Sequence, residues 1–174
     1  MPSLTLITYA TRYGSTQEVA KALAVGLQKN GAEAECRPMR EVENLKGYST
    51  VVLGSPIYLG ALQEDLRHFL SKHQKALSQL PVAIFALGPI TSPHNEAEWQ
   101  EAKAQLHKQI AAISWFKPRA VQLFGGKFDH SKIRAPMKWF TGKIPESDLR
   151  DWATIEAWAA ELPLLLSTSF TNES

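Results

Sequence analysis

Tyr9-Ala10-Thr11-Arg12-Tyr13-Gly14-Ser15-Thr16 is the most informative stretch of this sequence. The short apolar, β-rich run at residues 4–9 predicts a buried strand, and apolar residues at helical spacing predict a helix over residues 16–28. The stretch is therefore a loop that joins a strand to a helix. The backbone N–H groups of such a loop and the N-terminus of its helix point at one place, and the helix dipole makes that place attractive to an anion.

The loop residues themselves favour a phosphate site. Thr11, Ser15 and Thr16 supply hydroxyl groups, and Gly14 allows the backbone to approach an oxygen closely. The alternative is a capped helix start without a ligand, because Ser and Thr are common at that position. Three hydroxyl residues and a glycine within six residues favour the phosphate site, which we assign to Thr11, Arg12, Tyr13, Gly14, Ser15 and Thr16.

The rest of the chain alternates strands with helices. Apolar runs predict further strands at residues 50–54, 81–87 and 119–124, and alternating small and polar residues predict an exposed or edge strand at residues 32–38. Helical spacing predicts helices at residues 63–73 and 95–113, with Asn95 as N-cap, and a last helix from Ser147 or Asp148 to Leu162, where Pro163 disturbs it. This order predicts an α/β fold with a doubly wound five-stranded parallel sheet, strand order 2-1-3-4-5, and helices on both faces. Ligands of such sheets bind at the carboxyl ends of the first and third strands.

Length and composition limit the possible functions. The 174 residues suit one domain, which we place at residues 1–166, followed by a polar C-terminal tail at 167–174. The lone Cys36 excludes an intrachain disulfide framework and a cysteine-based metal cluster. No residues have the spacing of a nucleophile or a metal site, so we assign no catalytic and no metal-binding residue. The net charge of +2 is too small to indicate nucleic acid as a partner.

The start of the chain, Met1-Pro2-Ser3, lacks the basic residues and the cleavage site of a signal peptide. No apolar run approaches the roughly 20 residues that span a bilayer. We therefore expect a cytoplasmic protein. These features do not indicate an oligomeric state.

The pattern Ile7-x-Tyr9-x-Thr11-x-x-Gly14-x-Thr16-x-x-x-Ala20-x-x-Leu23 resembles the signature of the flavodoxin family. Thr8 departs from it, since the signature prefers a large apolar residue there. The resemblance implies a flavodoxin-like fold and a phosphate loop that holds FMN. Three other folds do not fit. A dinucleotide-binding domain needs Gly-x-Gly-x-x-Gly, a P-loop needs Gly-Lys-Ser/Thr, and a response regulator needs an aspartate where Gly54-Ser55-Pro56 stands.

A second loop, Gly54-Ser55-Pro56-Ile57-Tyr58-Leu59-Gly60, follows the third strand and lies beside the first loop in this strand order. Pro56 and Gly60 frame a tight turn, and Tyr58 can present an aromatic face. The resemblance implies that this turn contacts the flavin ring and that the peptide at Gly60 adjusts to the redox state of the flavin. The implied site residues are Ser55, Pro56, Ile57, Tyr58, Leu59 and Gly60. The alternative for Tyr58 is a rim tyrosine without a ligand.

A third loop begins with Leu87-Gly88-Pro89 and runs to Asn95. The resemblance implies that Leu87, Gly88 and Pro89 meet the pyrimidine edge of the flavin or its ribityl chain. The alternative is an ordinary connection rich in proline and glycine.

Further motifs resemble one branch of the family, which contains menaquinone-dependent protoporphyrinogen dehydrogenases and related flavodoxin-domain proteins. These motifs are residues 52–58, 69–73, 125–128 and 148–152. The resemblance implies an FMN-binding oxidoreductase that is quinone-linked and protoporphyrinogen-dehydrogenase-like. One alternative is a flavodoxin-type electron carrier that docks a redox protein partner, although such carriers are usually acidic. A second alternative is a flavin-free binding module of the same fold.

Residues 127–143 stand where those dehydrogenases carry a long basic and apolar insertion. This segment has a net charge of +4, and the rest of the chain has −2. Its charged residues are Lys127, Lys132, Arg134, Lys138 and Lys143 against Asp129. Together with Trp139 and Phe140, they predict weak peripheral contact with an anionic membrane, at its inner face, or with an acidic partner. The alternative is a solvated connection whose two aromatic residues pack onto the body of the protein.

Overall fold

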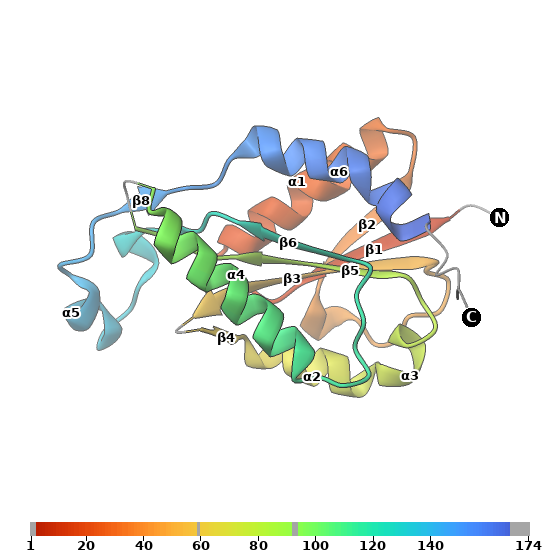
Figure 1. The fold of residues 1–174 in the computed structure, drawn as a ribbon, viewed down its shortest axis with the longest axis horizontal. Helices are drawn as coiled ribbons and strands as arrows, with labels where there is room; N and C mark the ends of the chain where they lie inside the picture. The colour runs from red at the N-terminus through yellow and green to blue at the C-terminus, as the bar shows by residue number, and fades with distance from the viewer. Residues whose placement is uncertain (1–2, 59, 92–93, 168–174) are drawn as a thin grey trace.

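A parallel sheet forms the centre of the computed structural model, which describes residues 3–58, 60–91 and 94–167 (Figure 1). Its parallel strands are β1 (Leu4–Tyr9), β2 (Glu33–Pro38), β3 (Thr50–Tyr58), β5 (Val82–Leu87) and β6 (Ala120–Phe124). Their order is β2-β1-β3-β5-β6, which confirms the predicted topology. β2 lies at an edge of the sheet, as its small and polar residues predicted.

Helices cover both faces of the sheet (Figure 1). One face carries α1 (Ser15–Lys29) and α6 (Trp152–Ser167), and the other carries α2 (Glu64–Lys72), α3 (Gln74–Leu77) and α4 (Glu96–Ala111). The inner strands β1, β3 and β5 carry buried apolar residues on both sides because both sides are covered. Ile7 of β1 packs in one core cluster with Leu23 of α1, whereas its neighbour Leu6 packs in the other cluster with Leu66 of α2.

The register of the strands aligns their carboxyl ends. Tyr9 of β1 lies opposite Gly54 of β3, Pro56 of β3 lies opposite Leu87 of β5, and Leu87 lies opposite Phe124 of β6. The three loops that we expected to form a site therefore leave the sheet at one edge.

The third strand is longer than predicted. We expected it to end at Gly54, but β3 continues to Tyr58 and turns back into β4 (Ala61–Leu62), with which it pairs antiparallel. Beyond Pro56, β3 is no longer paired with β5, and β4 takes over as its hydrogen-bonding partner. Gly60 has a φ of 76° in this tight hairpin, a conformation that strains any residue with a Cβ.

The last helix begins and ends later than predicted. It begins at Trp152, because the Asp151 side chain accepts hydrogen bonds of 3.0 and 3.2 Å from two backbone N–H groups of its first turn. Pro163 does not end the helix, since the buried side chain of Leu166 holds the following turn in the core. The part of the predicted tail at residues 168–174 lies outside the described residues.

Two other predicted helices are close to their observed bounds. The helix expected over residues 63–73 is α2, and the short helix α3, which was not predicted, follows it directly after His73. Asn95 caps α4 as predicted, because its Oδ1 accepts a hydrogen bond from the N–H of Glu98 at 3.2 Å. The link between β2 and β3 contains only the short helix η1 (Met39–Glu41).

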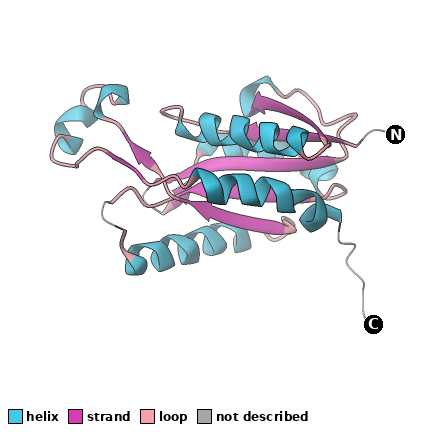
Figure 2. Cartoon of the chain, turned by 90° about the horizontal axis from the view of Figure 1, so that it is seen from above, coloured by secondary structure: helices cyan, strands magenta, loops and turns pink. Residues whose placement is uncertain are grey.

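The segment between β6 and α6 forms an arm, a name that we use for residues 127–148. β7 (Lys127–Phe128) pairs antiparallel with β8 (Ser147–Asp148), and between them lie η2 (His130–Lys132) and the short helix α5 (Met137–Thr141). The arm projects from the carboxyl end of the sheet (Figures 1 and 2). The sequence patterns predicted neither β7 nor α5, and they assigned the residues of β8 to the last helix.

Candidate functional site

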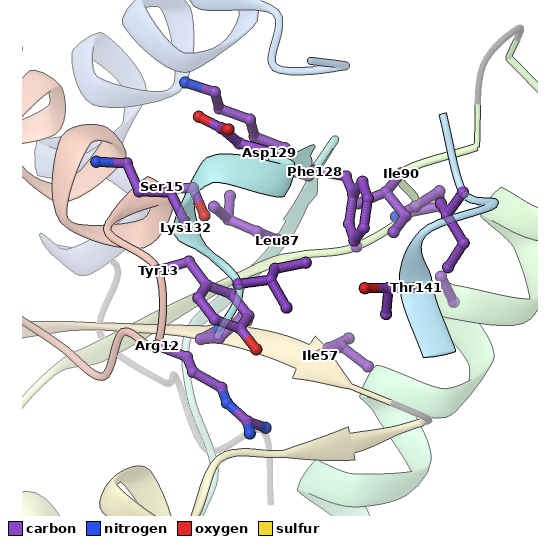
Figure 3. Close-up of a pocket in the computed structure, with 18 of the residues that line it drawn as sticks. Arg12, Tyr13, Ser15, Ile57, Leu87, Ile90, Phe128, Asp129, Lys132 and Thr141 are labelled. Atoms are coloured by element: carbon purple, nitrogen blue, oxygen red, sulfur yellow. The ribbon is translucent and has the colours of Figure 1, made fainter. Parts of the chain in front are cut away.

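A cavity of about 640 Å³ opens at the carboxyl end of the sheet, where the three expected loops meet. Figure 3 shows Tyr13 on one side of this cavity, Phe128 and Thr141 on the other, and Ile57 and Leu87 between them. Most of the expected site residues line it. They are Arg12, Tyr13, Ser15, Pro56, Ile57, Gly60, Leu87, Gly88 and Pro89.

The first loop enters α1 through a glycine in the left-handed conformation. Gly14 has a φ of 91°, and its N–H donates a hydrogen bond of 2.9 Å to Thr11 Oγ1. A positive φ strains residues with a Cβ, so the chain needs a glycine here. Among the described residues no side chain caps α1, which leaves the N–H groups of its first turn to a ligand or to solvent. The loop therefore has the geometry of an anion site at a helix N-terminus.

Thr16, the second residue of α1, is fully buried. Its Oγ1 has no hydrogen-bond partner within the part of the chain that the structure describes, and the same is true of Thr8 Oγ1 within β1. Leaving a buried hydroxyl unpaired costs about 1–3 kcal/mol, so such groups in folded proteins usually have a partner. The residues of the loop thus fit an oxyanion, because an anionic oxygen would accept the missing hydrogen bond from Thr16.

Some expected site residues are not part of the cavity wall. They are Thr11, Gly14, Thr16 and Ser55. Thr11 acts within the loop, through its hydrogen bond from Gly14. The buried Ser55 hydroxyl donates to the carbonyl of Pro56 (2.9 Å) and accepts from the N–H of Gln63 (3.2 Å). Ser55 therefore ties the start of α2 to the β3–β4 hairpin.

The β3–β4 hairpin contributes one wall of the cavity. Pro56, Ile57 and Gly60 line it, and the first two offer apolar surface. The ring of Tyr58 and the whole of Leu59 lie outside what the structure describes. Their assignment to the site stays a prediction.

The third loop is fixed to the base of the arm. The N–H of Gly88 donates to the carbonyl of Phe124 (2.8 Å), and the N–H of Gly126 donates to the carbonyl of Pro89 (2.9 Å). A Cβ at Gly126 would lie 2.5 Å from the carbonyl oxygen of Gly88, so the two backbones are in direct contact. This close packing holds the loop in place beside the cavity.

Two parts of the chain that the sequence reasoning did not assign to the site complete the wall. α4 contributes Glu98, Glu101, Ala102 and Gln105, and the arm contributes Lys127, Phe128, Asp129, Lys132, Ile133, Met137, Thr141 and Ile144. The α4 residues recur every three or four positions, so the sequence does contain the signal of one helix face. The residues of the arm as a whole have no regular spacing, because the arm consists of four very short elements joined by irregular segments.

The arm has two different faces. Met137 and Thr141, one helical turn apart on α5, line the cavity. Trp139 and Phe140 are 81% and 79% exposed, and Lys138 between the two faces is exposed as well. The interpretation that the two aromatic residues pack onto the body of the protein is therefore wrong.

A buried arginine joins the end of the arm to α1. The Arg150 side chain is 3% exposed, and its Nη1 donates a hydrogen bond to Glu18 Oε2. Its Nε and Nη2 donate to the two carboxylate oxygens of Asp148, at 2.8 and 2.7 Å. These hydrogen bonds raise the pKa of Arg150 and hold the pKa of Asp148 below its ordinary value. The guanidinium also lies over the ring of Trp152, 4.8 Å from its centroid.

The site is suited to binding a ligand that has an anionic end and an apolar body.

Within residues 3–58, 60–91 and 94–167, no group of three or more His, Cys, Asp or Glu side chains is placed to hold a metal ion. Across those same residues, no helix has the length and apolar character needed to cross a membrane.

Comparisons with known proteins are consistent with this geometry. The chain is 25% identical over 173 residues to a protein named protoporphyrinogen IX dehydrogenase (quinone) from Escherichia coli strain K12, and the match covers 91% of this chain and 93% of that protein. Oxidised flavodoxin 1 from Bacillus cereus matches with a TM-score of 0.59 at 16% identity, over 95% of this chain and all (100%) of the other. Flavodoxin 2 from the same organism matches with a TM-score of 0.56 at 17% identity, over 95% and 98% of the two chains.

The solved structures establish the fold, and they confirm the flavodoxin-like topology expected from the first loop. The relative from Escherichia coli confirms the resemblance to the dehydrogenase branch. A family model described as a flavodoxin domain matches residues 6–144, which is most of the sequence. The chain belongs to the flavodoxin-domain family.

Proposed function

We propose that this chain is an FMN-dependent oxidoreductase whose cofactor binds in the cavity at the carboxyl end of the sheet. The flavodoxin-like family binds FMN. The observation that carries the proposal is the buried hydroxyl of Thr16 in the first turn of α1, which has no partner in the described part of the chain and lies next to Ser15 in the cavity wall. The phosphate of FMN is an acceptor of the kind that this hydroxyl lacks.

The residues of the chain would bind, orient and shield the cofactor. Ser15, Thr16 and the first N–H groups of α1 would hold the phosphate. Ile57 and Leu87 offer apolar surface that would exclude water from the flavin ring. The bound flavin supplies the redox chemistry, and the protein supplies binding and tuning of the potential.

A quinone is the proposed redox partner. The relative from Escherichia coli carries quinone in its name. In this chain the inner face of the arm adds Ile133, Met137 and Ile144 to the cavity wall, and such a wall suits an apolar ring. An electron carrier that docks a redox protein is the competing function. Docking a protein does not require this apolar wall, whereas binding a quinone ring does.

The outer face of the arm supports peripheral contact with an anionic membrane. Trp139 and Phe140 are the most exposed of the large apolar side chains described, and Lys138 and Lys143 are exposed beside them. Aromatic residues anchor interfacial proteins, and each basic residue near an anionic surface contributes about 1 kcal/mol. A cytoplasmic protein that touches the inner face of the membrane is therefore part of the proposal.

Sedimentation with lipid vesicles tests the membrane contact. We expect binding to anionic vesicles but not to neutral ones, and less binding at high ionic strength because salt screens the charges. No binding to either kind of vesicle would reject the lipid contact and favour an acidic protein partner, and equal binding to both would reject the role of the basic residues.

Titration of the apoprotein with flavins tests the cofactor. We expect FMN to bind stoichiometrically, riboflavin to bind more weakly because it lacks the phosphate, and FAD to bind poorly. Equal affinity for FMN and riboflavin would contradict the phosphate site. After anaerobic reduction, rapid reoxidation by a water-soluble quinone would support the oxidoreductase. Reoxidation by a redox protein alone would favour the carrier.

A further inference from the structure

Glu18 creates an electrostatic difficulty for the proposed phosphate site. It lies in the first turn of α1 and lines the cavity, with 54% of its side chain exposed. A carboxylate at this position interacts favourably with the helix dipole in the apoprotein. A phosphate bound at the same helix end would compete for that dipole and would be repelled by the carboxylate.

Arg150 is placed to offset this repulsion. Its buried guanidinium donates to the Glu18 carboxylate through Nη1 and to Asp148 through Nε and Nη2. A buried guanidinium stays charged and is costly unless it is paired, so both carboxylates are held against it. Arg150 is not among the described residues of the cavity wall, whereas Glu18 is. Any influence of Arg150 on a ligand in the cavity therefore passes through Glu18.

We propose that Arg150 is a positioning residue for the phosphate of FMN. It neutralises and holds Glu18, so that the first turn of α1 accepts a doubly charged phosphate beside Thr16. The same guanidinium also binds Asp148 at the end of the arm. Arg150 therefore both attaches the arm to α1 and prepares the first turn of α1 to bind the phosphate. The inference rests on the FMN site proposed above and adds a residue that no loop motif contains.

A purely structural Arg150 would behave differently in solution. If it only fastened the arm to α1, its loss would loosen the cavity and weaken every flavin to a similar extent. An electrostatic role affects only a ligand that carries the phosphate. Riboflavin has the same ring and ribityl chain without that group, so it distinguishes the two roles.

The test compares four forms of the full chain, the wild type, Arg150→Gln, Glu18→Gln and the double variant, by quenching of flavin fluorescence at low ionic strength. We expect Arg150→Gln to weaken FMN about tenfold, the effect of one like charge near the site, and to leave riboflavin unchanged. The double variant has the same net charge as the wild type and should recover most of the FMN affinity. The loss in Arg150→Gln should shrink at high salt.

Asp148→Asn in the Arg150→Gln background is the matched control. It restores the same net charge, but Asp148 is not in the described cavity wall, so it should recover less FMN affinity than Glu18→Gln does. Equal weakening of FMN and riboflavin, or no recovery in the double variant, would overturn the proposal. If Arg150→Gln does not fold, Glu18→Gln alone still decides, because it should bind FMN at least as tightly as the wild type and a weaker affinity would contradict the inference.

The outcomes also separate this inference from the function on which it rests. A wild type that binds no FMN would overturn both. A wild type that binds FMN, with Arg150→Gln binding it equally well, would overturn only the role of Arg150.

Discussion

The cavity has two walls of different origin. The strand wall consists of the loops after β1, β3 and β5, and the parallel register of the sheet places these loops at one edge. The arm wall consists of one face of α4 and of the arm, whose ends pair through β7 and β8 and which Arg150 joins to α1 through Asp148 and Glu18. The proposed cofactor half of the site therefore follows from the order and register of the strands. The other half lies outside the parallel sheet, so the strand order does not determine it.

The largest expected effect tests how rigid the strand wall is. A Cβ at Gly54 would lie 2.3 Å from the ring of the fully buried Phe85. We expect Gly54→Ala to lower the free energy of unfolding by about 3 kcal/mol, the upper end of the usual cost of overpacking. Gly142→Ala in the arm, whose Cβ would lie 3.4 Å from the carbonyl oxygen of Lys138, should change it by less than about 0.5 kcal/mol. Urea denaturation measures the free energy of unfolding of both variants. Equal losses of this free energy would show that the strand wall is no more rigid than the arm wall.

The second prediction separates the two faces of the arm. Met137 lines the cavity and Phe140, on the same helix, is exposed. Met137→Gln should raise KM for a water-soluble quinone about tenfold, the effect of about 1.4 kcal/mol of lost apolar contact. It should leave FMN affinity unchanged. Phe140 is not in the described cavity wall, so Phe140→Gln should change neither quantity, and a similar rise in KM for both variants would show that the inner face has no special role.

The parallel sheet was predictable because buried strands and amphipathic helices leave strong patterns. The run at residues 4–9 and the run at 81–87 are apolar on both sides, and only a covered parallel sheet accommodates them. The continuation of β3 was not predictable from its own residues, because Pro56 and Gly60 are typical of a loop. The paired partner β4, not local propensity, makes this stretch a strand. One domain over residues 1–166 stays a prediction.

The candidate site was predictable to the extent that it follows from the sheet. The loops after three strands meet because their strands are neighbours, and nine of the site residues predicted in these loops line the cavity. The arm wall was missed because its residues are brought together by tertiary contacts of an irregular segment. The basic and aromatic composition of that segment indicated a surface, which the exposed Trp139 and Phe140 support, but it did not indicate that Ile133 and Met137 face inward.

The smallest expected effect concerns the attachment of the arm at low pH. Hydrogen bonds from Arg150 hold the pKa of Asp148 below its ordinary value. The pair therefore contributes its full stabilisation above the ordinary aspartate pKa of about 3.9 and loses it as the pH falls through the lower folded-state pKa. Asp148→Asn should be less stable than the wild type at pH 7 by at most about 1 kcal/mol, because the carboxylate is partly solvated.

Thermal unfolding of both proteins between pH 7 and low pH measures this gap. We expect the difference in stability to close as the pH falls below about 4. A gap that stays constant over the whole range would show that Asp148 does not stabilise the arm through its charge.

Thr16 and Thr8 offer the most direct test of the central claim, which is that the first turn of α1 binds the phosphate of FMN. Both residues are fully buried, and neither hydroxyl has a partner among the described residues, but Thr16 lies in the phosphate loop and Thr8 within β1. Fluorescence titration of Thr16→Val and Thr8→Val with FMN and riboflavin compares the loss of a buried hydroxyl in the phosphate loop with the loss of one in β1. The account predicts that Thr16→Val weakens FMN by roughly 1–3 kcal/mol without affecting riboflavin, and that Thr8→Val leaves both affinities unchanged. Equal FMN affinity in the wild type and both variants would contradict it.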